Sequence, residues 1–284
     1  MKDQAHNLKQ LLFDGPAREP QVTVYAVVSG KGGVGKSNIS LNLALEMHRC
    51  GRRVLLIDGD TGMANLDILA GVAGRHSMIN YFEDELPLED ILIEIQPGFH
   101  LLPGGSGLSG LQSQSREEIR SFVDDLMGRS YDVILIDAGA GVNAKLLSFV
   151  SFSHELILVT VPEPTAMADA YSLAKILSVY SIKEEVGVVI NQVSGRREAL
   201  ETYERLEKVI TTFLNLKVRF LGYVSSDPKV RRAVNLQRPF SEAFPSSAAS
   251  RDIGELCSVL LDGAQIRRTG TLADTVSRFM KVFS

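Results

Sequence analysis

A glycine-rich loop between a run of β-branched residues and a helical pattern most constrains the fold of this chain. The run Val22–Val28 is typical of a strand that is buried on both faces of a parallel sheet. The sequence GKGGVGKS follows at residues 30–37, and apolar residues at helical spacing continue to Met47. This order of strand, loop and helix predicts a phosphate-binding loop. The expected fold is α/β, with a doubly wound, mainly parallel sheet flanked by helices.

The loop offers the groups that a nucleoside triphosphate and its metal ion need. Its glycines carry no Cβ, so the backbone can curl with its N–H groups around a phosphate at the helix N-terminus. Lys36 is expected to reach the β- and γ-phosphates, and the Ser37 hydroxyl is expected to bind Mg²⁺, which prefers hard oxygen ligands. The alternative is a glycine-rich turn that only joins a strand to a helix. The residues expected to bind ATP or ADP with Mg²⁺ are Gly30, Lys31, Gly32, Gly33, Val34, Gly35, Lys36, Ser37 and Asn38.

Two aspartates follow the next buried strand, which the sequence RVLLI at residues 53–57 predicts. Ligands of open α/β sheets bind at the carboxyl ends of the strands. Asp58 is expected to hold a water of the magnesium shell, and Asp60 is expected to orient the water that attacks the γ-phosphate. An aspartate that caps the following turn is the alternative, and it accounts well for Asp67.

A third aspartate has the setting of a Walker B residue. The apolar residues 133–136 predict a strand, and Asp137 follows them directly. Asp137 is expected to accept a hydrogen bond from a magnesium-bound water or from Ser37. Gly139 and Gly141 would let the next loop come close to the γ-phosphate.

Composition limits the remaining possibilities. With 284 residues, of which 45% are hydrophobic and 23% charged, the chain fits one large α/β domain. A formal net charge of −4 gives no global basicity for nucleic acid. Cys50 and Cys257 are the only cysteines, which suits a reducing cytosol and excludes a cysteine-built cluster within one chain. There is no signal-peptide pattern and no apolar run of about 18 residues, so we expect no spanning helix.

The loop and the first two aspartates resemble those of the MinD/ParA ATPases. The sequence KGGVGKS at residues 31–37 resembles the deviant Walker A motif, and residues 58–67 are similar to the D-x-D-x-G-x-x-N-L-D switch of that family. The resemblance implies an ATPase that dimerises around two ATP molecules and separates after hydrolysis. It also implies that Lys31 reaches the partner's nucleotide and neutralises developing charge, which makes it catalytic together with Asp60 and Lys36.

Contacts with adenine are expected at two later positions. Asn191 follows the predicted strand 186–190, and its side-chain amide can both donate to and accept from the base edge. The resemblance implies this role for Asn191 and places the segment GYVSSDP beside the base, which makes Asp227 a second candidate. In that segment Ser225 stands where the family usually has proline.

The N-terminal residues point to a protein partner. Apolar residues at helical spacing predict a short helix, which is too short to be stable unless it folds against something else. The sequence DQAHNLK resembles the DQAxxLR activator element of the flagellar, FlhG-type branch of MinD-like ATPases, with Lys9 in place of arginine and its planar fork. This resemblance implies stimulation of an FlhF-type GTPase, contact with flagellar C-ring components and regulation of flagellar number and placement. A tail docked on its own domain is the alternative. The element comprises Asp3, Gln4, Ala5, Leu8 and Leu11.

The last residues predict an amphipathic helix with an aromatic-rich stripe, which follows a polar hinge beyond Gly263. Its position at the end of the sequence favours an anchor on the membrane surface. One copy would bind lipid weakly, whereas two copies in a dimer would bind as a bivalent anchor. Docking of the stripe on the body of the protein is the alternative. The stripe comprises Leu272, Val276, Phe279, Met280 and Phe283.

These features predict three segments. They are an activator element with its linker (1–20), an ATPase domain (21–262) and a hinge with the membrane helix (263–284). The chain is expected to be cytoplasmic and peripheral on the inner face of the cell membrane.

The alternative function is that of a ParA-type ATPase, which binds DNA non-specifically as an ATP dimer. Such binding needs a basic face. Arg231-Arg232 and Arg267-Arg268 offer little for one, so we do not expect DNA as a partner. A scaffold with a silent nucleotide site is a third possibility.

Overall fold

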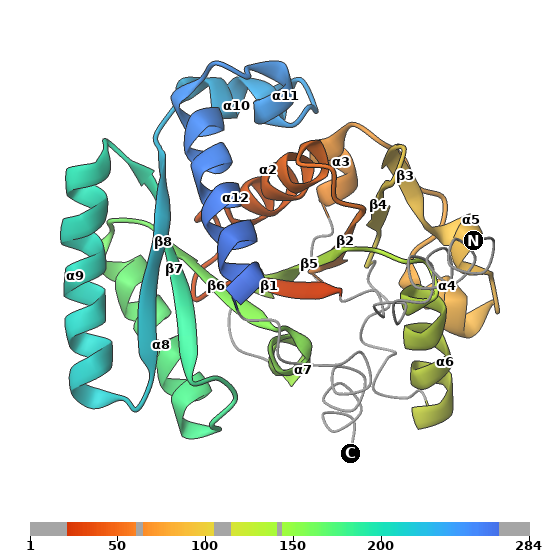
Figure 1. The fold of residues 1–284 in the computed structure, drawn as a ribbon, viewed down its shortest axis with the longest axis horizontal. Helices are drawn as coiled ribbons and strands as arrows, with labels where there is room; N and C mark the ends of the chain where they lie inside the picture. Colours follow the sequence, from red (N-terminus) through yellow and green to blue (C-terminus); the bar gives the residue numbers. More distant parts are fainter. Residues whose placement is uncertain (1–21, 61–64, 105–114, 141–143, 267–284) are drawn as a thin grey trace, which may run out of the picture.

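The computed structural model describes residues 22–60, 65–104, 115–140 and 144–266. Its strands form one eight-stranded sheet in the order β3-β4-β2-β5-β1-β6-β7-β8. Neighbouring strands are parallel, except for the antiparallel pair β3 and β4. Helices cover both faces of this sheet (Figure 1). The strands are β1 (Thr23–Ser29), β2 (Val54–Gly59), β3 (Ile93–Gln96), β4 (Phe99–Leu102), β5 (Val133–Ala140), β6 (Glu155–Thr160), β7 (Glu185–Val193) and β8 (Lys217–Ser225).

Two hydrophobic cores separate the helices into two groups. The first core, the α7 face, packs against α4 to α9, and the second core, the α2 face, packs against α2, α3 and α10 to α12. The helices are α2 (Lys36–Arg49), α3 (Leu66–Ala70), α4 (Met78–Glu83), α5 (Leu88–Ile91), α6 (Arg116–Met127), α7 (Ala144–Phe152), α8 (Pro164–Val179), α9 (Arg196–Phe213), α10 (Pro228–Asn235), α11 (Phe240–Ala243) and α12 (Ala248–Ile266).

The central strand β1 is apolar along its length because both of its faces are covered. Val24, Ala26 and Val28 pack into the α7 face, whereas Tyr25 and Val27 pack into the α2 face. All five side chains are fully buried. Successive side chains of a strand point to opposite faces, so a strand covered on both sides needs apolar residues at every position.

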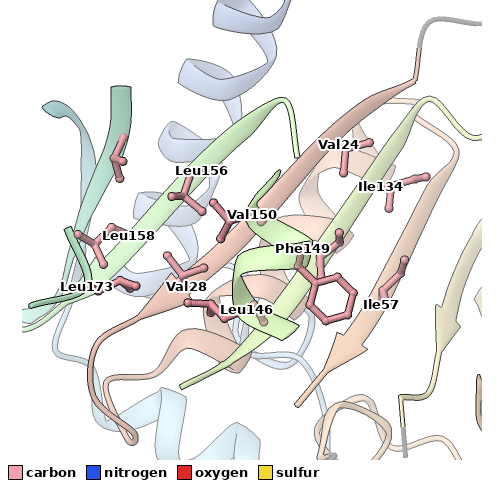
Figure 2. Close-up of a cluster of buried hydrophobic side chains, with 14 of the residues drawn as sticks. Val24, Val28, Ile57, Ile134, Leu146, Phe149, Val150, Leu156, Leu158 and Leu173 are labelled. Carbon is pink, nitrogen blue, oxygen red and sulfur yellow. The ribbon is translucent and has the colours of Figure 1, made fainter. Parts of the chain in front are cut away.

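Figure 2 shows how α7 fills the middle of its face. Phe149 and Val150 of α7 lie over the sheet among Val28 of β1, Leu156 of β6 and Ile57 of β2. These side chains come from one helix and from three strands in the middle of the sheet, so the core joins α7 to several strands at once. The parallel order then brings the carboxyl ends of β1, β2, β5, β6 and β7 to one edge.

The structure confirms the four predicted strands and the helix after the glycine-rich loop to within a few residues at their ends. It also corrects one expectation. α12 runs through Gly263 to Ile266, so a helix occupies the start of the predicted hinge. In the range 75–110, which the sequence patterns left unassigned, the structure has α4, α5, β3 and β4.

Several elements were not predicted, among them α3, α7, α10, α11 and β8. β3 alternates apolar and polar residues over only four positions, which is too short to distinguish from a loop. The predicted activator element and membrane helix lie outside the described residues. Among the helices that the structure does describe, none is both long enough and apolar enough to cross a membrane.

Leu158→Ala is expected to lower the free energy of unfolding by about 2–5 kcal/mol, because truncation of a fully buried leucine leaves a cavity. Leu236→Ala removes the same atoms from a side chain that is 58% exposed. This control is expected to change stability by no more than about 0.5 kcal/mol. Urea unfolding followed by circular dichroism measures both values. Equal losses for the two variants would contradict the core described here.

Candidate nucleotide-binding site

The glycine-rich loop is wedged between α8 and β7 at the carboxyl edge of the sheet. α2 begins at Lys36, and Gly35 before it adopts the left-handed conformation with φ 88°. A Cβ on Gly30 would lie 2.2 Å from the backbone of Asp169 in α8, and a Cβ on Gly35 would lie 2.3 Å from Nδ2 of Asn191 in β7. Side chains at these positions would push the loop away from both elements. Glycine therefore keeps the loop N–H groups at the N-terminus of α2, where an anion can bind.

A buried ion pair joins α2 to β5. Lys36 Nζ donates to Asp137 Oδ1 over 2.8 Å, and Ser40 Oγ donates to the same oxygen over 2.8 Å. Lys36 is 6% exposed and Asp137 is 1% exposed. Asp137 Oδ2 is buried and has no hydrogen-bond partner within the described ranges. Buried carboxylate oxygens are normally paired, so this oxygen fits the predicted contact with a water of a magnesium ion.

The serine bonded to Asp137 is not the predicted one. Ser37 lies on the first turn of α2 and is partly exposed, whereas Ser40 is fully buried. Ser40 lies one turn further along α2, so its side chain meets β5 while Ser37 stays beside the loop. The role of Ser37 as a magnesium ligand remains a prediction.

Asp58 lies beside Asp137, because the two residues are paired in the register of β2 and β5. Burial, and then the charge of Asp137, raise the pKa of Asp58 to about 6. The carboxylate accepts hydrogen bonds from the backbone N–H groups of Asp60, Asn65 and Leu66 over 3.1, 3.2 and 3.2 Å. Asp58 thus holds the start of α3, which is the capping role given as the alternative. Its place in a magnesium shell remains a prediction.

The other two acidic residues of the switch lie close by. Asp60 follows β2 directly, and a Cβ on Gly139 of β5 would lie 3.7 Å from Asp60 Oδ1. The loop after β5, with Gly141, lies outside the described residues. Asp67 accepts a hydrogen bond from the N–H of Ile68 over 2.7 Å in the first turn of α3, in agreement with a local structural role.

Lys31 lies at the surface of the site. Its Nζ donates to Glu163 Oε2 over 3.0 Å and to Thr165 Oγ1 over 3.1 Å, both at the start of α8. The side chains of Lys31 and Glu163 are 38% and 60% exposed. An exposed ion pair of this kind stabilises a protein by only about 0–1 kcal/mol. Sequence patterns did not identify Glu163 and Thr165, although the segment PEPT directly after a buried strand was the available signal.

A cavity of about 370 Å³ adjoins the loop and contains both predicted adenine contacts. Asn191 Nδ2 donates to the carbonyl oxygen of Val34 over 2.7 Å, and its Oδ1 accepts from the N–H of Gln192. Asn191 therefore supports the loop, and one amide hydrogen and one lone pair remain for a base. Gln192 has φ 58°, an uncommon conformation for a residue other than glycine.

Asp227 has a structural role at the rim of this cavity. Its two oxygens accept from the N–H groups of Lys229 and Ala248 over 2.9 and 3.1 Å, so it joins the starts of α10 and α12. Contact of Asp227 with the base remains a prediction. Gln192, Arg231 and Phe240 also line the cavity, and sequence patterns did not assign them to it.

Asp58→Asn is expected to change how stability depends on pH when nucleotide and magnesium are absent. The pKa of Asp58 is raised from 3.8 to about 6, so between these values the folded state binds more protons than the unfolded state. The carboxylate therefore destabilises the fold increasingly as pH rises through this window, by about 3 kcal/mol in full. Wild-type stability relative to the variant should fall between about pH 4 and pH 7 in denaturant unfolding. Parallel pH profiles for the two proteins would contradict this.

Comparisons with known proteins agree with this geometry. A family model described as the CobQ/CobB/MinD/ParA nucleotide binding domain matches residues 25–240. The antiactivator FleN of Pseudomonas aeruginosa is 36% identical over 81% of this chain and 82% of that protein. The flagellum site-determining protein YlxH of Helicobacter pylori is 36% identical over 83% of this chain and 81% of that protein.

Solved structures show the same fold. The septum site-determining protein MinD of Pyrococcus horikoshii, complexed with Mg-ADP, has a TM-score of 0.71 and 26% identity, and the match covers 88% of this chain and 100% of that one. The range matched by the family model contains the loop, the three aspartates and Asn191. This chain belongs to the MinD/ParA family of nucleotide-binding ATPases.

Proposed function

We propose that this chain regulates flagellar number and placement as an ATPase that dimerises when ATP is bound. Two relatives named for flagellar roles, each 36% identical over most of both chains, support the flagellar assignment. The observation that carries the dimer is the contrast between two lysines of one loop. Lys36 is 6% exposed and bound to Asp137, whereas Lys31 is held only by exposed partners. Lys36 is therefore placed to bind the nucleotide of its own chain, whereas the side chain of Lys31 can turn outward.

Bound ATP and Mg²⁺ supply the γ-phosphoryl group and a metal charge that offsets the charge of the transition state. The loop N–H groups at the start of α2 bind the phosphates. Lys36 exchanges its bond with Asp137 for phosphate oxygens. Both oxygens of Asp137 would then be available to the magnesium ion or its waters, while Ser40 keeps the carboxylate in place.

Asp60 and Lys31 complete the site for hydrolysis. Asp60, at the end of β2 near Gly139, orients the attacking water. Lys31 leaves Glu163 and Thr165 and reaches the nucleotide of the partner, so hydrolysis requires two copies. Loss of the γ-phosphate removes the group that both copies hold, and the dimer separates.

The two ends of the chain connect this cycle to other components. Residues 3–11 stimulate an FlhF-type GTPase, and flagellar C-ring components are further partners. Residues 272–283 bind lipid at the inner face of the cell membrane, weakly in one copy and strongly when a dimer presents two. The resemblance of the first segment and the apolar stripe of the second support these roles.

Lys31→Ala and Lys36→Ala are expected to fail at different steps. Lys36→Ala loses ATP binding, because it removes the phosphate contact and leaves Asp137 buried without its counter-charge. Lys31→Ala keeps ATP binding but stays monomeric, and its phosphate release falls about 100-fold or more. Binding of a fluorescent ATP analogue, light scattering with a slowly hydrolysed analogue and phosphate release measure the three properties.

Asp60→Ala is the matched control for these variants, since it should dimerise normally but fail to hydrolyse ATP. A Lys31→Ala chain that dimerises and turns over like the wild type would exclude the proposed role of Lys31. Unchanged turnover in Asp60→Ala would exclude the water-orienting role of Asp60.

Phe279→Glu is expected to abolish sedimentation with anionic liposomes in the presence of the ATP analogue. It places a charge within the apolar stripe of the predicted terminal helix, where burial in lipid is unfavourable. Ser277→Glu adds the same charge on the polar face and should still sediment. Equal sedimentation of wild type and Phe279→Glu would refute the anchor. Retention on heparin without retention on liposomes would instead favour the DNA-binding alternative.

A further inference from the structure

The end of β7 contains a β-bulge beside the nucleotide cavity. Asn191 is paired with Val224 of β8. Val193 is paired with the next residue of β8, Ser225, so Gln192 is an extra residue in β7. Gln192 also has φ 58°, in the left-handed region that residues with a side chain rarely adopt. Bulges are common next to active sites, where they redirect a side chain.

The bulge shifts the alternation of side chains along β7. Ile190 packs into the α7 face, and Val193 packs into the same face. Regular alternation would place residue 192 in that face and residue 193 on the opposite one. Because of the extra residue, Asn191 and Gln192 both line the cavity of about 370 Å³, together with Ile39 of α2. A side chain that regular pairing would turn toward the core is thus turned into the cavity.

The two adjacent amides differ in how many of their hydrogen bonds are already made. The amide of Asn191 donates to the carbonyl oxygen of Val34 and accepts from the N–H of Gln192. The side chain of Gln192 is exposed, and its amide has no hydrogen-bond partner among the residues that the structure describes. Its Nε2 lies near the loop, 3.8 Å from the position of a Cβ on Gly35. Gln192 therefore offers a ligand a complete amide, with two hydrogens and two lone pairs.

The strain at this position supports a role for the side chain. Glycine would adopt φ 58° without strain, whereas a residue with a Cβ is destabilised there. Strained residues gather at ligand sites, where the surrounding structure holds them in place. Strain at Gln192, whose free amide lies beside a cavity, therefore points to a ligand for that amide.

We propose that Gln192 binds the purine base of the nucleotide beside Asn191, and that the bulge of β7 places its amide within reach of the base. A side-chain amide offers a donor and an acceptor side by side. This pair matches the exocyclic amino group of adenine and the ring nitrogen next to it. The inference rests on nucleotide binding at this site, and it is independent of dimerisation and of the flagellar role.

The cavity leads from the phosphate-binding loop past the end of β7. Gly33 and Gly35 of the loop line it, and so does Asp227, which follows β8. β7 lies beside β8 in the sheet, and Asn191 at its end is bonded to the loop. A nucleotide that extends from the loop toward Asp227 therefore passes both amides.

The test measures the affinity of the full chain for ADP and for pyrophosphate, each with Mg²⁺, by isothermal titration calorimetry. Gln192→Gly removes the amide and keeps the left-handed backbone. The affinity for ADP should fall by about 5- to 100-fold, the loss expected for one bidentate contact between an amide and a base. The affinity for pyrophosphate, which has no base, should stay the same.

Gln237→Gly is the matched control for this variant. Gln237 is also exposed and has φ 52°, but it is not among the residues that line the cavity. Its replacement removes the same atoms from the same kind of backbone and should leave both affinities unchanged. Gln192→Leu keeps a side chain of similar size without polar atoms, and it should lose ADP affinity by the same factor as Gln192→Gly.

Two further ligands identify the group that Gln192 contacts. The 5′-diphosphate of purine riboside lacks the exocyclic amino group, so Gln192→Gly should lower its affinity by a smaller factor, about 2- to 10-fold for one remaining hydrogen bond. 2′-Deoxy-ADP lacks a ribose hydroxyl, and the variant should lower its affinity as much as that of ADP. A smaller loss for 2′-deoxy-ADP would place Gln192 at the ribose and overturn the contact with the base.

Other results would also overturn the inference. Equal ADP affinity in the wild type and Gln192→Gly would do so and leave the nucleotide site intact. A parallel loss of ADP and pyrophosphate affinity would mean that the side chain acts on the loop and not on the base. A wild type that binds neither ligand would overturn the nucleotide site itself, and this inference with it.

Discussion

The buried ion pair between Lys36 and Asp137 is the interaction on which the rest of the site depends. Removing two charges from water costs several kcal/mol, and their attraction offsets this cost only when the geometry is good. The 2.8 Å contact meets that condition, and Ser40 adds a second hydrogen bond to the same oxygen. Loss of either charge would leave the other buried, at a cost of about 3–5 kcal/mol. The pair therefore keeps α2 against β5 before any nucleotide binds.

The charges of Lys36 and Asp137 also act on Asp58 in the neighbouring strand β2. Asp58 lies beside Asp137, and the charge of Lys36 is one of the factors that lower its pKa, against burial and Asp137, which raise it. A phosphate that bound Lys36 would draw this cation away from the buried carboxylates of Asp58 and Asp137. A magnesium ion bound with the nucleotide would supply positive charge in its place, so in the proposed site phosphate and metal would favour each other's binding. Asp58 also accepts a hydrogen bond from the N–H of Leu66 at the start of α3. The charge around Asp58 is thereby linked to the switch segment at residues 58–67.

The sequence was enough to predict a residue's role where its neighbours along the chain determine that role. Val22–Val28 had to be a doubly covered strand, and the spacing of the loop glycines required a sharp turn before a helix. It did not suffice where the partner comes from a distant element. Ser37 and Ser40 share one helix, and only packing against β5 decides which of them meets Asp137. Likewise, nothing near Asn191 in the sequence indicates its bond to the loop carbonyl of Val34.

In the proposed cycle, the two lysines of the loop would separate nucleotide binding from dimerisation. Lys36 makes a buried contact that only a strongly charged competitor can replace, and a phosphate inside the loop is such a competitor. Lys31 makes an exposed contact worth about 0–1 kcal/mol, which any well-placed anion can replace. In the proposed dimer, a second copy would present that anion only after its own loop holds a triphosphate. Occupation of both loops would therefore precede the exchange at Lys31, and an empty chain would have little reason to pair.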